Sequence, residues 1–440
     1  MLSTDKPHNP VVYAKFAGKL EPAEKRKRIL FYGHYDVVPA NTQEGKWLTD
    51  PFKLTGMNGY LYGRGVSDNK GPIIAALYAV TDLMQAKALD SDIIFLIEGE
   101  EEAGSRGFQE TVWKHKKLIG DVDYILLANS YWLDDEVPCL TYGLRGVLHA
   151  TVCVDSRHPD LHSGVDGSYM MSEPLSDLTV LLSKLKGPRN RIMIPKFYDG
   201  ILPVTSEEEA RYDDITSILI RRNPENGPAG LLKQSLMARW REPNLTIHRY
   251  KVSGPDGSLV SSHASSNISL RLVPGQEVED VIQSLVAFLH EEFKKSESVN
   301  SLTISIDNKA EPWLGVPGNY IFRTLEEAVM RVWGPVSEND ARHAEGDVNE
   351  GGASEGGGKK EQEVFSKAME DEPCKSRKPL YIREGGSIPA IRFLEKEFGA
   401  PAAHLPCGQA SDAAHLDNER LRVTNLLKSR EIFELVFRKL

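Results

Sequence analysis

The stretch Ile93-Ile94-Phe95-Leu96-Ile97-Glu98-Gly99-Glu100-Glu101-Glu102-Ala103-Gly104-Ser105 decides the fold. Its first five residues predict a buried strand, and the Gly-Ser-Arg-Gly sequence at 104–107 predicts the turn into a helix at residues 108–117. Open α/β sheets place their chemistry at the carboxyl ends of strands, where these carboxylates lie. Three consecutive glutamates repel one another, so they are stable only when solvated, paired or bound to a cation. Taken alone, the cluster is equally compatible with two interpretations, a solvated acidic loop and a cation-binding site.

A second strand end carries a histidine and an aspartate. Residues 28–37 form an apolar run that contains His34-Tyr35-Asp36. Side chains at i and i+2 of a strand point the same way, so Asp36 can fix the tautomer of His34 while the other ring nitrogen binds a metal. Alone, such a pair is weak evidence for a metal site.

A glycine-rich turn precedes the next predicted helix, at residues 73–86. The turn reads Gly63-Arg-Gly-Val-Ser-Asp68-Asn-Lys-Gly71, and Pro72 opens the helix. It lacks the spacing of the common phosphate-binding loops. We therefore interpret Asp68 as a metal ligand or a helix cap.

Three further polar positions follow predicted strands. Asn129 ends the strand at residues 124–130, and His415 lies in the loop 407–415 that follows a strand at 402–406. Arg383 precedes a Gly-Gly-Ser turn, and a guanidinium beside backbone donors suits a substrate carboxylate. Because strands alternate with amphipathic helices, the sequence predicts an α/β fold with a mostly parallel catalytic sheet covered by helices.

The pattern changes in the middle of the chain. Residues 146–310 predict strands of a smaller sheet with two helices, which indicates an inserted α+β domain between catalytic parts at 1–145 and 311–440. His162 lies in a polar loop of this domain, where an ordinary surface loop is the alternative interpretation. Residues 335–377 are rich in Gly, Glu, Asp, Ser and Lys, and we expect a disordered insertion there.

Composition excludes several classes of function. The 440 residues are enough for two or three domains, and the net charge of -10 argues against a nucleic-acid partner. No apolar run approaches the roughly 18 residues of a membrane span, and residues 1–10 lack a secretory pattern. The four cysteines lack metal-type spacing, so we expect reduced thiols and a cytoplasmic location.

Taken together, the motifs resemble the co-catalytic zinc metallopeptidases, the family of carnosinase, cytosolic nonspecific dipeptidase and aminoacylase. The motifs that carry this resemblance are Gly33-His-Tyr-Asp-Val-Val-Pro39, Trp47-Leu-Thr-Asp-Pro-Phe52, the 63–71 turn, the 98–105 stretch, Asp160-Leu-His-Ser-Gly164 and Arg383-Glu-Gly-Gly-Ser-Ile-Pro389. The motifs most similar to the carnosinase-like branch are Tyr131-Trp-Leu133, Thr141-Tyr-Gly-Leu-Arg-Gly146, Arg239-Trp-Arg241 and Ser269-Leu-Arg-Leu-Val-Pro274. That branch includes the peptidase half of the large subunit of the fungal glutathione-degradation complex.

The resemblance implies two zinc ions per subunit and a ligand set. The zinc ligands that it implies at matching positions are His34, Asp68, Glu102 and His415, with Asp68 bridging the two ions. It also implies that Glu101 is the general base, which takes a proton from a shared water and later passes it to the leaving amine. Mn²⁺ and Co²⁺ also suit His and carboxylate ligands.

The remaining roles implied by the resemblance concern the substrate. Asp36 corresponds to the carboxylate behind His34, and His162 to a residue that crosses a homodimer to the substrate oxyanion in the other subunit. Arg383 with Gly385, Gly386 and Ser387 corresponds to the loop that recognises the substrate carboxylate.

Asn129 departs from the family pattern. It stands where the family has an aspartate as the last ligand of the second zinc. Losing one carboxylate leaves an uncompensated positive charge, and an amide oxygen is a poorer zinc donor than a carboxylate. We therefore expect the second site to bind its metal weakly and to be partly occupied.

Two functional hypotheses follow. The first is a zinc-dependent peptidase acting on dipeptides or short peptides with a free carboxylate, including Cys-Gly-like or glutathione-derived peptides. The second is a weakly active or inactive scaffold subunit in a larger complex, with an amidotransferase-like partner. Only 33 residues precede His34, fewer than is usual in the family, which favours a truncated chain or a partner that replaces the missing helices.

Overall fold

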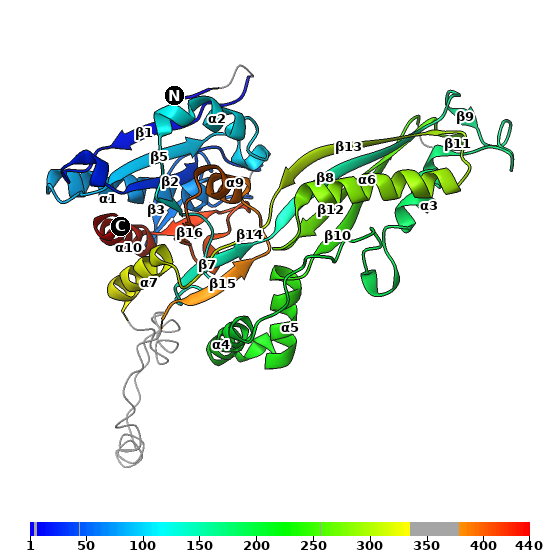
Figure 1. Cartoon of the computed structure of the whole chain (residues 1–440). Coiled ribbons are helices and arrows are strands. Elements are labelled where there is room, and N and C mark those ends of the chain that lie inside the picture. Colours follow the sequence, from blue (N-terminus) through cyan, green and yellow to red (C-terminus); the bar gives the residue numbers. More distant parts are fainter. Residues whose placement is uncertain (4–6, 44, 256, 335–377) are drawn as a thin grey trace, which may run out of the picture.

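The computed structural model describes residues 1–3, 7–43, 45–255, 257–334 and 378–440. The insertion expected to be disordered, at 335–377, lies outside the described residues. Figure 1 shows a larger body, which contains both the blue N-terminal and the red C-terminal segments, and an elongated smaller body in green.

The larger body is built on an eight-stranded sheet of order β1-β5-β2-β6-β16-β7-β14, with β15 also paired to β7. The strands are β1 (Val12–Phe16), β2 (Arg28–His34), β5 (Asp92–Glu98), β6 (Tyr124–Leu127), β7 (Cys139–Leu144), β14 (Trp313–Leu314), β15 (Leu380–Glu384) and β16 (Ala402–His404). The four central strands β5, β2, β6 and β16 are mutually parallel, whereas β1 and β7 join them antiparallel. The predicted α/β class with a helix-covered sheet is confirmed.

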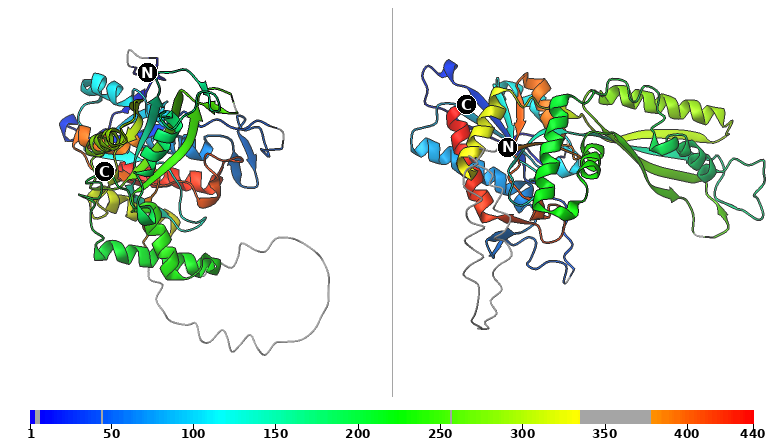
Figure 2. Two further views of the ribbon diagram at one scale, coloured as in Figure 1. Left: turned by 90° about the vertical axis from the view of Figure 1, so that its right-hand side faces the viewer. Right: turned by 90° about the horizontal axis from the view of Figure 1, so that it is seen from below.

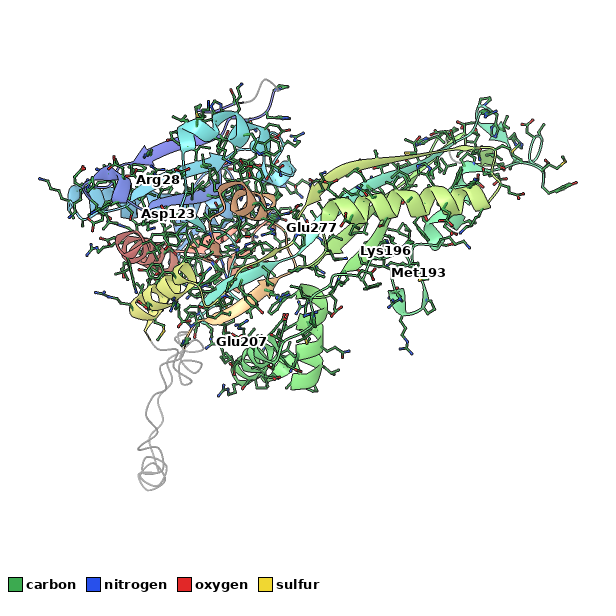
Figure 3. The ribbon with its side chains drawn as sticks, in the orientation of Figure 1. Arg28, Asp123, Met193, Lys196, Glu207 and Glu277 are labelled. Atoms are coloured by element: carbon green, nitrogen blue, oxygen red, sulfur yellow. The ribbon has the colours of Figure 1, made fainter. Side chains whose placement is uncertain are left out.

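The central strands are buried along nearly their whole length, which explains why their sequences are uninterrupted apolar runs. Every residue of β5 is buried, as expected for a strand covered on both faces. At the start of β2 the Arg28 backbone N–H donates to Asp123 Oδ2 at 2.9 Å, and these two residues lie together in Figure 3. This contact sets the register between β2 and β6.

Helices cover both faces of this sheet. Consecutive residues of β2 point to opposite faces, and Phe31 contacts Phe433 of α10 while Tyr32 contacts Phe108 of α2. Helices α1, α10 and α7 pack side by side in one layer, and α2 packs beside α9 in the other. The bounds of these helices are α1 (Gly71–Gln85), α2 (Phe108–Ile119), α7 (Tyr320–Trp333), α9 (Pro389–Phe398) and α10 (Val423–Lys439).

The smaller body is an antiparallel sheet of order β10-β12-β8-β13 with two helices. Its elements are β8 (Gly146–Asp155), α3 (Pro174–Ser183), β10 (Asn244–Val252), β12 (His263–Leu272), α6 (Val278–Lys295) and β13 (Ser301–Ala310). Alternate residues of β8 are buried against the helices, and those between them face away. The other face of the sheet is not covered by α3 or α6, as the views in Figure 2 show.

Two adjacent strands join the bodies. β7 runs into β8 through Arg145, and β13 runs into β14 through residues 311–312. β7 pairs with β14 and β8 pairs with β13, so the two connections lie side by side as a two-stranded ribbon. Near this ribbon Lys396 of α9 forms an ion pair with Glu277, the residue labelled at the junction in Figure 3.

A helical hairpin packs under β15. It consists of α4 (Ser206–Arg222) and α5 (Ala229–Trp240), and its buried Tyr212 and Trp240 share a small core with Ile382. Small sheets are formed by β3 (Thr55–Met57), β4 (Tyr60–Tyr62) and β17 (Arg420–Arg422), and by β9 (Leu161–His162) and β11 (Leu259–Val260). In the part of the chain that the structure describes, no helix has the length and apolar character needed to cross a membrane.

Candidate metal centre and substrate cavity

The predicted site residues follow the carboxyl ends of the parallel strands. β2 ends at His34, Glu101 and Glu102 follow β5, and Asn129 lies two residues after β6. His415 lies in the loop after β16, the next parallel strand. Parallel strands end at the same edge of a sheet, which explains why residues so distant in sequence meet.

Four of these residues form a cluster, which we call the His–carboxylate cluster: His34, Asp68, Glu102 and His415. Asp68 lies between the two histidines, with Oδ1 2.9 Å from His34 Nε2 and Oδ2 2.9 Å from His415 Nε2. Glu102 Oε1 is 3.2 Å from the same nitrogen of His415. Asp68 thus directs one carboxylate oxygen towards each histidine.

The cluster fits a metal ion. Ligand atoms of His34, Asp68 and Glu102 all lie within 4.8 Å of one another. Glu102 Oε1 is buried and faces His415 Nε2, so it is directed into the cluster. Two imidazoles and two carboxylates are donors that Zn²⁺, Mn²⁺ and Co²⁺ accept.

Electrostatics support ionised carboxylates in this cluster. Burial opposes the ionisation of Asp68, but hydrogen bonds from His34 and His415 outweigh it and hold the pKa of Asp68 well below its usual value. The reciprocal hydrogen bonds to Asp68 and Glu102 raise the pKa of His415 to about 10. A cation that binds here therefore replaces a proton on His415.

Asp36 supports the cluster from behind. Its Oδ1 lies 3.4 Å from His34 Nδ1, and its Oδ2 accepts a hydrogen bond from the Glu102 backbone N–H at 3.0 Å. The Asp36 carbonyl oxygen lies 3.2 Å from the same His34 nitrogen, so Asp36 orients the ring through its backbone with its carboxylate alongside, and the carboxylate fixes the turn that carries Glu102. A carbonyl or carboxylate behind the ring is the arrangement expected of a metal-binding histidine.

Glu101 lines the cavity beside the cluster. Its burial raises its pKa to about 8, with His34 opposing the shift and the Glu98, Asp68 and Glu102 carboxylates adding to it. A carboxyl group whose pKa lies near neutrality is suited to accept and return a proton. The neighbouring Glu100 differs, because its buried carboxylate pairs with Arg106 at 2.6 Å and it does not line the cavity.

Asn129 lies at the cluster through its amide. Its Nδ2 is 3.5 Å from His34 Nε2, and its Oδ1 accepts from the Ser130 backbone N–H at 2.5 Å. The amide oxygen is therefore already engaged by the neighbouring residue. Its role as a metal ligand stays a prediction.

The cluster opens into a central cavity of about 410 Å³ between the two bodies. The larger body contributes Glu101, the turn at Gly386 and Ser387, and three members of the cluster, Asp68, Glu102 and His415, while the smaller body contributes His149, Arg271 and Asn308. Gly104 closes the glutamate turn at φ 86°, and a Cβ there would collide with Asn308. A side cavity of about 760 Å³ adjoins the central one and shares Asp68, Tyr131 and His415 with it.

The structure does not bring Arg383 to the central cavity. Its Nη2 pairs with Glu208 of α4 at 2.8 Å, and its guanidinium lies over the Tyr142 ring. The side chain is buried, and it joins α4 to β15. Gly385 lines the side cavity, whereas Ser387 lines the central cavity.

Arg271, for which the sequence analysis proposed no role, lines the central cavity instead. Its Nη1 donates to Ser387 Oγ at 3.0 Å, and burial lowers the pKa of its guanidinium. No acidic side chain among the described residues forms an ion pair with it within 4.0 Å. A signal was present, because Arg271 alternates with the buried Leu270 and Leu272 in β12 and so must face the other side of the sheet.

His162 lies elsewhere. It is exposed in β9, at the far end of the smaller body from the cluster (Figure 1). The structure does not bring it to the cavity of its own chain. Its predicted role requires a second copy of the chain and stays a prediction.

Comparisons with known proteins agree with this geometry. The model of peptidase family M20/M25/M40 matches residues 30–353. The chain is 40% identical over 438 residues to a probable di- and tripeptidase, DUG2, of Saccharomyces cerevisiae, which covers 98% of this chain but only 44% of that protein. It is 31% identical to the Cys-Gly metallodipeptidase DUG1 of Candida albicans, over 95% of this chain and 79% of that protein. Among solved structures, human carnosine dipeptidase 1 matches with a TM-score of 0.72 and 28% identity, covering 99% of this chain and 85% of the other.

Proposed function

Because the chain belongs to peptidase family M20/M25/M40, we propose that it is a metal-dependent peptidase that hydrolyses dipeptides or short peptides with a free C-terminal carboxylate. The observation that carries the proposal is that Glu101, Arg271 and three members of the His–carboxylate cluster, Asp68, Glu102 and His415, line one cavity. The Cys-Gly metallodipeptidase and the β-Ala-His dipeptidases among its relatives make Cys-Gly and similar dipeptides the first substrates to test.

The proposed ligands are His34, Asp68, Glu102 and His415, and the proposed metal is Zn²⁺, with Mn²⁺ and Co²⁺ as the other candidates. When bound, the cations supply Lewis acidity that lowers the pKa of water and polarises the scissile carbonyl. Asp36 holds His34 in one orientation throughout.

Glu101 is the proposed proton carrier. It accepts a proton from the attacking water as the oxygen bonds to the carbonyl carbon, and it delivers that proton to the amine nitrogen as the C–N bond breaks. Its oxygen atoms are free for this work because Glu102, not Glu101, belongs to the His–carboxylate cluster.

Arg271 and Ser387 are the proposed anchor for the substrate carboxylate. Arg271 is held by its hydrogen bond to Ser387 and forms no ion pair with an acidic residue in the described part of the chain, so its charge is available to an anion. An arginine fork pairs well with a planar carboxylate. Glu384, which accepts hydrogen bonds from Ser130 and Thr141 and lines both cavities, is suited to face the substrate amine.

The test is a cleavage profile with defined metals. The chain is stripped with a chelator, supplied with Zn²⁺, Mn²⁺ or Co²⁺, and assayed on Cys-Gly, β-Ala-His and the same dipeptides as C-terminal amides. The proposal requires metal-dependent release of the C-terminal residue and poor cleavage of the amides. Metal uptake without cleavage of any member of a dipeptide and tripeptide library would contradict it.

Asn129 favours a second candidate function, a peptidase fold that serves as a weakly active scaffold in a larger assembly. The amide oxygen is engaged by Ser130, and an amide is a poorer zinc donor than a carboxylate. In this case a homodimer through residues 146–310 or an amidotransferase-like partner in the cytoplasm would complete the assembly.

We predict that Asn129→Asp strengthens metal binding at the site that contains His34 and Asp68. The added carboxylate restores the missing negative charge, and the gain should be about tenfold or more, the size that changes around a metal site typically produce. Elemental analysis after dialysis should show occupancy rising towards two ions per chain. Full occupancy of both sites in the parent chain would remove the basis of this prediction. Cleavage activity that appears only in Asn129→Asp would favour the scaffold for the natural chain.

A further inference from the structure

Two members of the cluster, Asp68 and His415, come from irregular segments at opposite ends of the sequence. Asp68 lies in the turn 65–70 that leads into α1, and His415 lies in the loop between β16 and β17. Strand ends hold His34 in place, whereas neither of these segments is fixed by a sheet ladder. Something else must set the distance between them.

One buried carboxylate connects the two segments. Glu419 Oε1 accepts hydrogen bonds from the backbone N–H groups of Ser67 and Asp68, both at 3.1 Å. Glu419 Oε2 accepts from the Gly65 backbone N–H at 2.9 Å and from Arg64 Nη1 at 2.8 Å. The Glu419 residue is only 1% exposed, so this carboxylate is satisfied entirely by the turn that carries Asp68.

Arg64 completes the connection. Its Nη1 pairs with Glu419, and its Nη2 donates to the His415 carbonyl oxygen at 3.3 Å. Asp68, Glu419, Arg64 and His415 therefore form a chain of hydrogen bonds behind the cluster. Charge-assisted hydrogen bonds of this kind are stronger than neutral ones and are sensitive to the loss of either partner.

We propose that Glu419 is a positioning residue that sets the separation of Asp68 and His415, and thereby the geometry of the paired cation sites. This inference rests on the proposed metal centre. It also explains why an acidic residue so close to the cluster is not itself a ligand. All its acceptor directions are used by backbone donors and Arg64, and Arg64 neutralises its charge.

The test compares metal binding in Glu419→Gln and the parent chain. Glutamine keeps the volume but replaces one acceptor oxygen with a donor that faces other donors. We expect zinc affinity, measured by competition with a chromophoric chelator, to fall by about tenfold or more. We also expect the visible absorption bands of the Co²⁺-loaded protein to shift, because the ligand geometry changes.

The matched control is Asp92→Asn. Asp92 is also buried, accepts from a backbone N–H and pairs with basic residues, but it lies at the opposite end of β5 from the cluster. It should lower the melting temperature of the metal-free chain without changing the zinc affinity or the cobalt spectrum. A role that is merely structural would make Glu419→Gln behave like this control.

If Glu419→Gln does not fold, the milder variant Arg64→Lys provides the test. Arg64→Lys keeps the charge beside Glu419 but removes the second arm that reaches His415, so its loss of zinc affinity should lie between those of the other two variants. Parental zinc affinity and a parental cobalt spectrum in Glu419→Gln, or in Arg64→Lys if Glu419→Gln does not fold, would overturn the proposal. A parent chain that binds no divalent cation would instead overturn the proposed function.

Discussion

Replacing Glu101 with glutamine is expected to lower kcat on a dipeptide by about 10²–10⁴-fold, the contribution that a positioned general base typically makes. The amide keeps the shape of the side chain but cannot accept the proton of the attacking water. Zinc content should stay at the parental level, because the His–carboxylate cluster is unchanged. The measurement is kcat and KM on Cys-Gly, with metal content determined on the same samples.

Glu100→Gln is the matched control for this prediction. Glu100 belongs to the same turn but pairs with Arg106 and accepts from the Asn9 backbone N–H, so it faces away from the cluster. The variant should retain most of the parental kcat. Equal turnover by Glu101→Gln and the parent chain would remove the catalytic role of Glu101.

Replacing Arg271 with methionine is expected to lower kcat/KM by about 10- to 100-fold, the equivalent of losing a hydrogen-bonded charge partner worth about 1.5–3 kcal/mol. The loss should fall mainly on KM, because the carboxylate is bound in the ground state as well as in the transition state. Methionine keeps most of the apolar stem. The measurement is the ratio of kcat/KM for a dipeptide to that for its C-terminal amide, which should approach one in the variant.

Arg383→Met is the informative comparison. The resemblance places Arg383 in the carboxylate-recognition loop, whereas its guanidinium pairs with Glu208 in the structure. Its loss leaves the buried Glu208 with one partner fewer, so the main expected effect is a lower melting temperature. If Arg383→Met, rather than Arg271→Met, abolished the preference for a free carboxylate, the assignment of Arg271 would be wrong.

The sequence was sufficient for the family and for the strand-end part of the site. The resemblance to the zinc metallopeptidases is confirmed by the family match over residues 30–353. His34 and Glu102 follow uninterrupted apolar runs, and such runs mark parallel strands whose ends share one edge. Their position at one sheet edge followed from that topology, whereas the approach of Asp68, which lies in a turn, did not.

The helical hairpin and the proposed substrate anchor could not be predicted from apolar strand patterns. Residues 206–240 form the hairpin of α4 and α5, which the sequence analysis did not predict. A local signal for the start of α4 existed, because the Thr205 side chain accepts a hydrogen bond from the Glu208 backbone N–H. In sequence, the Gly-Gly-Ser turn after Arg383 favours that residue as the carboxylate partner, and nothing comparable marks Arg271. Only tertiary packing reverses this preference, because α4 brings Glu208 to Arg383 while β12 directs Arg271 into the cavity.

The two-stranded ribbon between the bodies gives the cavity a pivot. Two strands cross from one body to the other here, and the chain crosses twice more through the segments that lead into α4 and out of α5. Glu101 and Arg271 stand on opposite sides of this ribbon, so a tilt of the smaller body would change the distance between the proposed proton carrier and the proposed anchor. Such a tilt would have to deform the backbone around Gly146, where Ala310 and Pro312 leave no room for a side chain.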